Sequence, residues 1–276
     1  MSLCGNINKT TKEDISDVEK ANTTSNQIDV FKIIGSLAKT QVDTNLLTTI
    51  SEDNPAFNLS DWDKIKTAYR QWREDEIRKG FYVESCLENP EVFIEKYGDK
   101  WMTDSLRYAL PNIPEKFPVI HEKFGFDIDT FMVDMNFDGK QDIIFKILPD
   151  DCLQGNGLAA HPPIYLTVLS RENTYIVDNT HINKVEKSIE NFREKLSDRE
   201  YSWISIDKIK NEQGIISISG NSCIYLENDA SCCPSVEFDF TAYMDKTTNG
   251  YIQVNGVYKN EFEETENKFE LKLRIE

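Results

Sequence analysis

The chain has 276 residues, a length that suits one large domain or two modest ones with room for a sizeable hydrophobic core. Its 31 Lys and Arg stand against 48 Asp and Glu, so the formal net charge at pH 7 is −17. This charge argues against a nucleic-acid partner, because phosphates would be repelled. It favours a cationic protein partner or calcium, although an acidic surface also serves solubility alone. No apolar run reaches the length of about 18 residues that a membrane-spanning helix needs.

The N-terminal stretch, residues 1–27, is polar and rich in Asn, Thr, Lys and Glu, which predicts a flexible tether. Cys4 lies close to the start and is followed by Gly and Asn. A bacterial lipoprotein begins, after its signal is cleaved, with a lipidated Cys that leads into such a tether, so we interpret Met1 to Leu3 as standing in place of the signal. The expectation is an exported, periplasmic or outer-membrane-associated protein that meets the membrane only through a lipid on Cys4. The alternative is an ordinary thiol at this position.

Residues 28–126 are expected to form a helical region. Apolar residues recur at helical spacing between Gln27 and Leu47, which predicts a short amphipathic helix. A second helix is predicted from Ser60, as its N-cap, to Gly80, as its stop. A third helix is predicted after Pro90, with a further turn or two before Leu110. The second helix carries an apolar stripe that indicates a core-facing side: Trp62, Ile65, Tyr69 and Trp72.

Residues 134–142, DMNFDGKQD, have the spacing of a calcium loop. Calcium takes six to eight oxygen ligands, and this spacing offers side-chain oxygens at positions one, three, five and nine and a backbone carbonyl at seven. Gly139 permits the sharp turn that wrapping an ion requires. The predicted ligands are Asp134, Asn136, Asp138, the Lys140 carbonyl and Asp142.

The twelfth position of this loop is Phe145 rather than the bidentate Glu of an EF-hand, and the flanking residues predict strands rather than helices. We therefore expect a loop between two β-strands that holds a structural calcium, with a further ligand from water or from Asp127, Asp129, Asp150 or Asp151. The alternative interpretation is an acidic turn without metal, because Asp, Asn and Gly also favour turns for conformational reasons.

From residue 127 onward the sequence alternates apolar and polar residues with a period of two, which is typical of half-buried antiparallel strands. The segments with this pattern are PIYLTVL, TYIVD, SWISID, GIISISG, VEFDFTAYMD, GYIQVNGVY and KFELKLRIE. One amphipathic helix, from about Thr180 to Ser197, interrupts them. The predicted fold is α+β: an N-terminal helical region packed on a mainly antiparallel β-rich domain, residues 127–276, with one inserted helix.

The cysteines beyond Cys4 do not have the spacing of a zinc site. In an exported protein, Cys223 is placed to bridge to Cys232 or Cys233 across a short hairpin, and a vicinal bond between Cys232 and Cys233 is the unusual option. The sequence does not choose among these pairings. A structural disulfide or a turn held by Pro234 is favoured over redox catalysis, because acidic neighbours such as Asp229 raise a thiol's pKa.

Three segments occur in a defined order over about residues 128–245: VDMNFDGKQDIIFKI, QGNGLAAHPPIYLTVL and NDASCCPSVEFDFTAY. This order resembles that of bacterial exported proteins with a VCBS or FG-GAP-like calcium motif and a downstream CCPS element. The resemblance implies an exported β-rich domain without a defined activity. Some relatives by motif are inhibitors or binding proteins of the cell envelope, so it favours interaction over catalysis. It transfers no catalytic residues, and the helix near residues 182–196 is an insertion relative to that pattern.

The sequence contains no recognisable catalytic motif: no GxSxG elbow, HExxH helix, P-loop or GxGxxG turn. His161 follows the calcium-type loop, but a loop histidine beside two prolines is typical of a surface residue. The expected function is that of a non-enzymatic, calcium-stabilised exported binding protein of the bacterial cell envelope, with an inhibitor or immunity-type lipoprotein as one form. The alternative is an envelope hydrolase acting on a polysaccharide or peptide.

Overall fold

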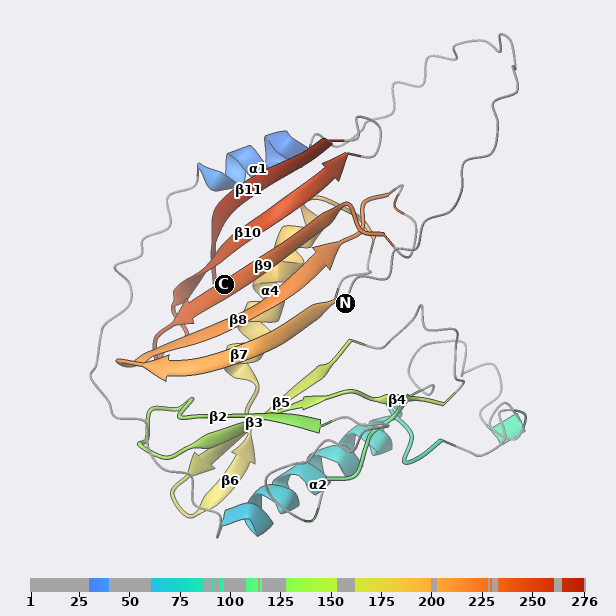
Figure 1. The fold of residues 1–276 in the computed structure, drawn as a ribbon. Helices are drawn as coiled ribbons and strands as arrows, with labels where there is room; N and C mark the ends of the chain where they lie inside the picture. Colours follow the sequence, from blue (N-terminus) through green and yellow to red (C-terminus); the bar gives the residue numbers. More distant parts are fainter. Residues whose placement is uncertain are drawn as a thin grey trace.

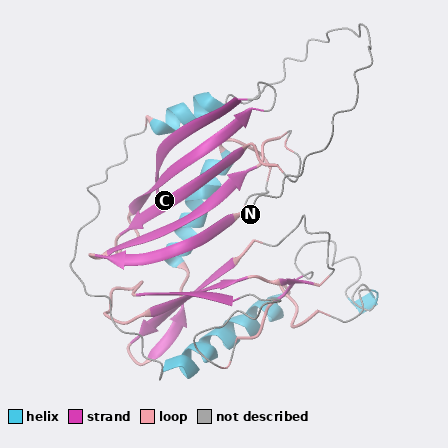
Figure 2. Cartoon of the chain, viewed as in Figure 1, coloured by secondary structure: helices cyan, strands magenta, loops and turns pink. Residues whose placement is uncertain are grey.

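The computed structural model describes residues 30–39, 61–86, 91, 95–96, 108–113, 115, 128–152, 162–199, 203–227, 229, 233–260 and 265–275. The predicted tether of residues 1–27, with Cys4, lies outside these ranges, as does most of the predicted third helix. The described chain is an α+β structure of mainly antiparallel sheets, as the sequence predicted (Figure 2). None of the helices in the described ranges is both long enough and apolar enough to cross a membrane.

The smaller sheet has four antiparallel strands in the order β2-β3-β5-β6. Its strands are β2 (Ile128–Val133), β3 (Asp142–Ile147), β5 (Ile164–Arg171) and β6 (Thr174–Val177). Helix α2 (Trp62–Lys79) runs along one face of this sheet (Figure 1). It ends where expected, at Gly80, whose φ of 81° is left-handed. The residue at its N-cap position is Asp61, one residue later than predicted.

Alternating residues of β3 form the core under α2. Ile143, Phe145 and Ile147 point to this face, where they pack with the helix residues Ile65 and Tyr69. The rings of Tyr69 and Phe145 meet edge-on, with centroids 5.4 Å apart. The aromatic stripe of the second predicted helix is therefore core packing.

The larger sheet has five antiparallel strands in the order β11-β10-β9-β8-β7. Its strands are β7 (Ile204–Glu212), β8 (Ile215–Ile224), β9 (Val236–Met244), β10 (Gly250–Asn260) and β11 (Thr265–Arg274). The predicted inserted helix is α4 (Thr180–Glu194), which Figure 1 shows across the back of this sheet. Helix α1 (Val30–Ala38) packs beside β11 and places Ile34 in the same core.

One continuous core joins the two sheets. Ile144, Tyr165 and Leu169 of the smaller sheet share it with α4 and with the inner face of the larger sheet. The Tyr165 hydroxyl accepts a hydrogen bond of 2.6 Å from the backbone amide of Ile206 in β7. The smaller sheet is thus covered on both faces, so the prediction of half-buried strands, with one face in solvent, is wrong for it. That prediction is confirmed for the larger sheet, where residues of β11 alternate between buried Leu271 and exposed Lys272.

Helices α1 and α2 of the predicted helical region lie on different sheets, and Tyr108–Ala109 of that region form a short strand, β1. Strand β1 pairs with β4 (Asp150–Asp151), just beyond the end of β3. Val83, which follows α2, bridges to Ala109. These contacts attach the segment after α2 to the far end of the β2–β3 hairpin.

Candidate metal centre

The predicted calcium loop joins β2 to β3, so its flanks are strands as expected. The chain turns sharply at two left-handed residues, Phe137 with a φ of 59° and Gly139 with a φ of 79°. Glycine adopts this conformation freely, whereas Phe137 does so at a cost. The turn folds the loop back over its own acidic side chains.

The acidic side chains accept hydrogen bonds from the loop backbone. The Asp134 carboxylate accepts from the amides of Asp138 at 3.2 Å and Gly139 at 2.9 Å. Asn136 Oδ1 accepts from the Asp138 amide at 2.9 Å, and Asp138 Oδ1 accepts from the Lys140 amide at 2.9 Å. Each carboxylate oxygen has two lone pairs, so an oxygen that accepts one amide retains capacity for a cation.

Ser170, at the end of β5, ties the loop to the next strand. Its amide donates to Asp142 Oδ1 at 2.6 Å and its hydroxyl donates to Asp138 Oδ2 at 2.9 Å. Its carbonyl accepts from Asn136 Nδ2 at 2.5 Å. Sequence reasoning missed Ser170, because it lies 28 residues beyond Asp142 and only the pairing of β3 with β5 brings it to the loop.

Two of the loop carboxylates are buried. Asp134 is 2 % exposed and Asp142 is fully inaccessible. Burial raises the pKa of Asp142 to about 6, against the opposing effect of hydrogen bonds from Ser170 and Met135. Burial also raises the pKa of Asp134. Desolvation therefore disfavours the charged form of both groups, which a bound cation would relieve.

Lys140, the one basic side chain of the loop, does not neutralise these carboxylates. Its ammonium donates to the carbonyl of Glu172 in the turn between β5 and β6, at 2.6 Å. Within the described ranges, neither Asp134 nor Asp142 forms an ion pair. The oxygen-rich donor set, its charge and its burial fit calcium chemically.

Three of the four outside carboxylates that we expected to complete the site lie elsewhere. Asp129, Asp150 and Asp151 are at the opposite end of the β2–β3 hairpin, and Asp127 is outside the described residues. The structure also brings no three His, Cys, Asp or Glu side chains into metal-binding range in the part of the chain that it describes. Calcium at this loop stays a prediction.

The loop also contacts the larger sheet. Asn211 of β7 donates its side-chain amide to the carbonyl of Asp134 at 2.7 Å. This bond joins residues 77 positions apart, so no local pattern in the sequence signals it. The loop thus contacts β5, the turn after it and the second sheet, which gives it a position from which an ion could stabilise the junction.

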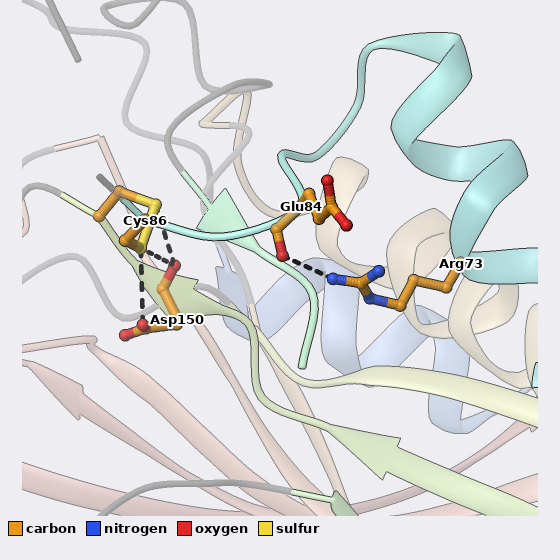
Figure 3. The surroundings of a disulfide bond; sticks show 5 residues. Arg73, Glu84, Cys86 and Asp150 are labelled. Atoms are coloured by element: carbon orange, nitrogen blue, oxygen red, sulfur yellow. Dashed lines mark hydrogen bonds between the residues drawn. A yellow bond between two sulfur atoms is a disulfide. The ribbon is translucent and has the colours of Figure 1, made fainter. Parts of the chain in front are cut away.

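The cysteines pair in a way that the sequence did not predict. Cys86, just after α2, forms a disulfide with Cys152, just after β4 (Figure 3). Arg73 of α2 holds the same segment, since its guanidinium donates to the backbone carbonyls of Glu84 at 2.5 Å and Leu110 at 3.0 Å. The disulfide therefore fastens a segment already tied to the β1–β4 pair.

The predicted bridge from Cys223 is wrong, because Cys223 is a free and buried thiol. In the pairing of β8 with β9, Cys223 lies opposite Glu237, four positions beyond Cys233. Cys233 therefore lies before the start of β9, outside the residues that pair with β8. Burial raises the pKa of the Cys223 thiol to about 11, which argues against a reactive thiolate. Cys232 lies outside the described residues.

Among the described residues, no histidine lies in a catalytic arrangement. His121 and His161 lie outside the described residues. His181 is in the first turn of α4, and burial lowers its pKa despite the nearby charges of Asp178 and Asp245. Both aspartates are engaged in turns, Asp178 through Thr180 and Asp245 through Thr247.

No family model, no curated protein and no solved structure matches this chain.

Proposed function

We propose that this chain is a non-enzymatic, calcium-stabilised binding protein exported to the bacterial cell envelope. The observation that carries the proposal is the pair of buried carboxylates, Asp134 and Asp142, inside a loop with calcium spacing. Two buried carboxylates that form no ion pair among the described residues are costly to ionise, and a calcium ion bound to the oxygen atoms of this loop would offset that cost. Calcium here would act structurally and leave binding to other surfaces.

Export is supported by the disulfide between Cys86 and Cys152. Disulfides persist in oxidising compartments and are rare where cellular reductants keep thiols reduced. Calcium supports the same location, since extracellular sites of modest affinity fill readily at millimolar calcium. A lipid anchor on Cys4 and an inhibitor or immunity-type role remain proposals that rest on the sequence alone.

A pull-down from envelope extract with the intact chain tests the function. We expect a specific partner or envelope ligand that is retained in calcium and lost in EDTA, because removal of the ion loosens the domain. The matched control is Asp138→Ala, which should lose retention in both conditions, whereas Asp129→Ala, at the far end of the hairpin, should behave as the parent. Turnover of a cell-wall polysaccharide or peptide by the same preparation, without specific capture, would favour the hydrolase alternative and contradict the proposal.

A further inference from the structure

An open groove lies on the solvent-exposed face of the larger sheet, away from the calcium-type loop. The groove crosses β8, β9, β10 and β11 near the end of the sheet where β8 ends and β9 begins. Helix α4 lies on the opposite face of the sheet (Figure 1). The side chains that matter for its chemistry are Trp203, Asn221, Asp239, Asn255, Lys268 and Glu270.

Four of these residues form one row straight across the sheet. Asn221 pairs with Asp239, Asp239 with Asn255, and Asn255 with Glu270, so all four side chains point to the same face. At about 4.8 Å between strands, the row is roughly 14 Å long. Amides and carboxylates alternate along it, on strands that hold them rigidly.

The residues at the two ends of the row form side-chain hydrogen bonds, whereas the two residues in the middle are open to a ligand. Asn221 donates its amide to Asp207 at 2.9 Å, and Glu270 accepts from Gln253 at 3.0 Å. The side chains of Asp239 and Asn255 are exposed and make no hydrogen bond or ion pair within the described part of the chain. The central carboxylate and amide are thus free to bind a ligand.

The charges of the groove nearly balance. Three carboxylates line it, from Glu237, Asp239 and Glu270, and Lys268 lines it too. Glu237 is neutralised by Lys259, whose ammonium lies 2.6 Å from it. One excess negative charge, within a chain of net charge −17, repels a polyanion. The groove itself is close to neutral, so it fits a ligand that is held by hydrogen bonds and apolar contact rather than by charge.

An aromatic side chain stands at one end of the groove. Trp203 lines the groove and is 37 % exposed. An indole ring in this position offers an apolar face beside a row of hydrogen-bonding groups. A ligand that fits both must have an apolar face and a polar edge.

We propose that this groove binds a neutral oligosaccharide. A sugar ring has C–H faces that stack on an aromatic ring, and adjacent hydroxyls that each donate and accept. The Asp239 carboxylate accepts from such hydroxyls, while the neighbouring Asn255 amide both donates and accepts, so the pair matches two adjacent hydroxyls. An oligosaccharide in this groove would be the ligand of the binding protein proposed above, and only that assignment rests on the proposed function.

Calorimetric titration of the intact chain tests the proposal. The probes are neutral oligosaccharides of glucose, galactose, mannose and N-acetylglucosamine, with tetralysine and heparin as charged competitors. We expect one neutral family to bind, and expect Asp239→Ala, Asn255→Ala and Trp203→Ala each to weaken it at least about tenfold, which corresponds to 1.4 kcal/mol. Lys210→Ala is the matched control, because Lys210 lies on the same face at the other end of the sheet and should leave binding unchanged.

All three substituted side chains are exposed, so melting temperatures should stay near the parent value and separate lost binding from lost folding. Binding of tetralysine or heparin in place of sugars, or no binding by any sugar in the panel, would overturn the proposal. The calcium response is measured separately. A chain that is stabilised by calcium but binds no sugar contradicts the groove alone, and sugar binding without a calcium response contradicts the proposed calcium-stabilised function alone.

Discussion

The amide of Ser170 donates to Oδ1 of Asp142 at 2.6 Å, across the boundary between β5 and β3, at a carboxylate with no solvent access. The other oxygen of Asp142 accepts from the Met135 amide at 2.7 Å. Asp142 therefore joins the loop, its own strand and the neighbouring strand through one side chain.

Asp142→Asn should destabilise the calcium-free protein by roughly 2–4 kcal/mol, because one acceptor oxygen becomes an NH₂ group that faces a buried amide donor. Urea unfolding in EDTA measures the free energy of unfolding. Asp129→Asn, on the exposed side of β2, is the control and should change it by less than about 0.5 kcal/mol. Equal effects of the two substitutions would show that Asp142 does not have this bridging role.

Phe145→Ala should cost about 3–5 kcal/mol of unfolding free energy, because Phe145 is fully buried and the cavity would open beneath Tyr69 and Trp62. The comparison is Phe81→Ala, whose ring is 52 % exposed and should matter little. Urea unfolding followed by tryptophan fluorescence reports both variants. A loss below about 1 kcal/mol for Phe145→Ala would contradict the packing of α2 on β3.

Replacement of Cys86 and Cys152 together by Ser should lower the free energy of unfolding by roughly 2–4 kcal/mol, since the bond closes a chain segment with a sequence separation of 66. The parent should lose a similar amount in dithiothreitol, and the double variant should not respond to it. A parent that is insensitive to the reductant, with both thiols shown to be reduced, would contradict a stabilising disulfide.

Glu186 of α4 provides a test by pH. Burial, with a smaller contribution from Glu190, raises the pKa of its carboxyl to about 7. In the unfolded chain the group ionises near its ordinary value of about 4.3, so the folded state holds the extra proton between these two values. The ionised form is the disfavoured one in the fold, and stability falls as the pH rises through this window.

Glu186→Gln should therefore match the parent near pH 4 and become more stable than it by roughly 2 kcal/mol at pH 8. The measurement is the difference in unfolding free energy between variant and parent at each pH, which cancels the other titrating groups. The control is Glu194→Gln, an exposed position on the same helix, which should show no such trend. A parent that gains on the variant as the pH rises would contradict the burial of Glu186.

Local patterns predicted most elements of this fold. The period-two segments became strands β5 to β11, and the 3.6-residue periodicities became α1, α2 and α4. These patterns record which side of an element is buried, and they are properties of neighbouring residues. They do not indicate which element covers the buried side. The division of the strands into two sheets, with Ile144 facing one core and Phe145 the other, was therefore not predictable.

Only the loop residues of the candidate site were predictable from the sequence. The loop acids follow from spacing, whereas Ser170, Asn211 and the pairing of Cys86 with Cys152 depend on contacts between distant segments. The proposed bridge from Cys223 was wrong because sequence proximity says nothing about strand register. Asp239 and Asn255 likewise become neighbours only through the pairing of β9 with β10.

The most direct test of the central claim is the melting temperature of metal-free protein with and without calcium, for the parent chain and for Asp138→Ala. At calcium about a hundredfold above its dissociation constant, binding adds about 2.7 kcal/mol, which corresponds to a rise of roughly 5 °C for a chain of this size. We predict this rise in the parent, its reversal by EDTA and its absence in Asp138→Ala. An unchanged melting temperature in parent protein shown to be metal-free at the start would contradict calcium stabilisation.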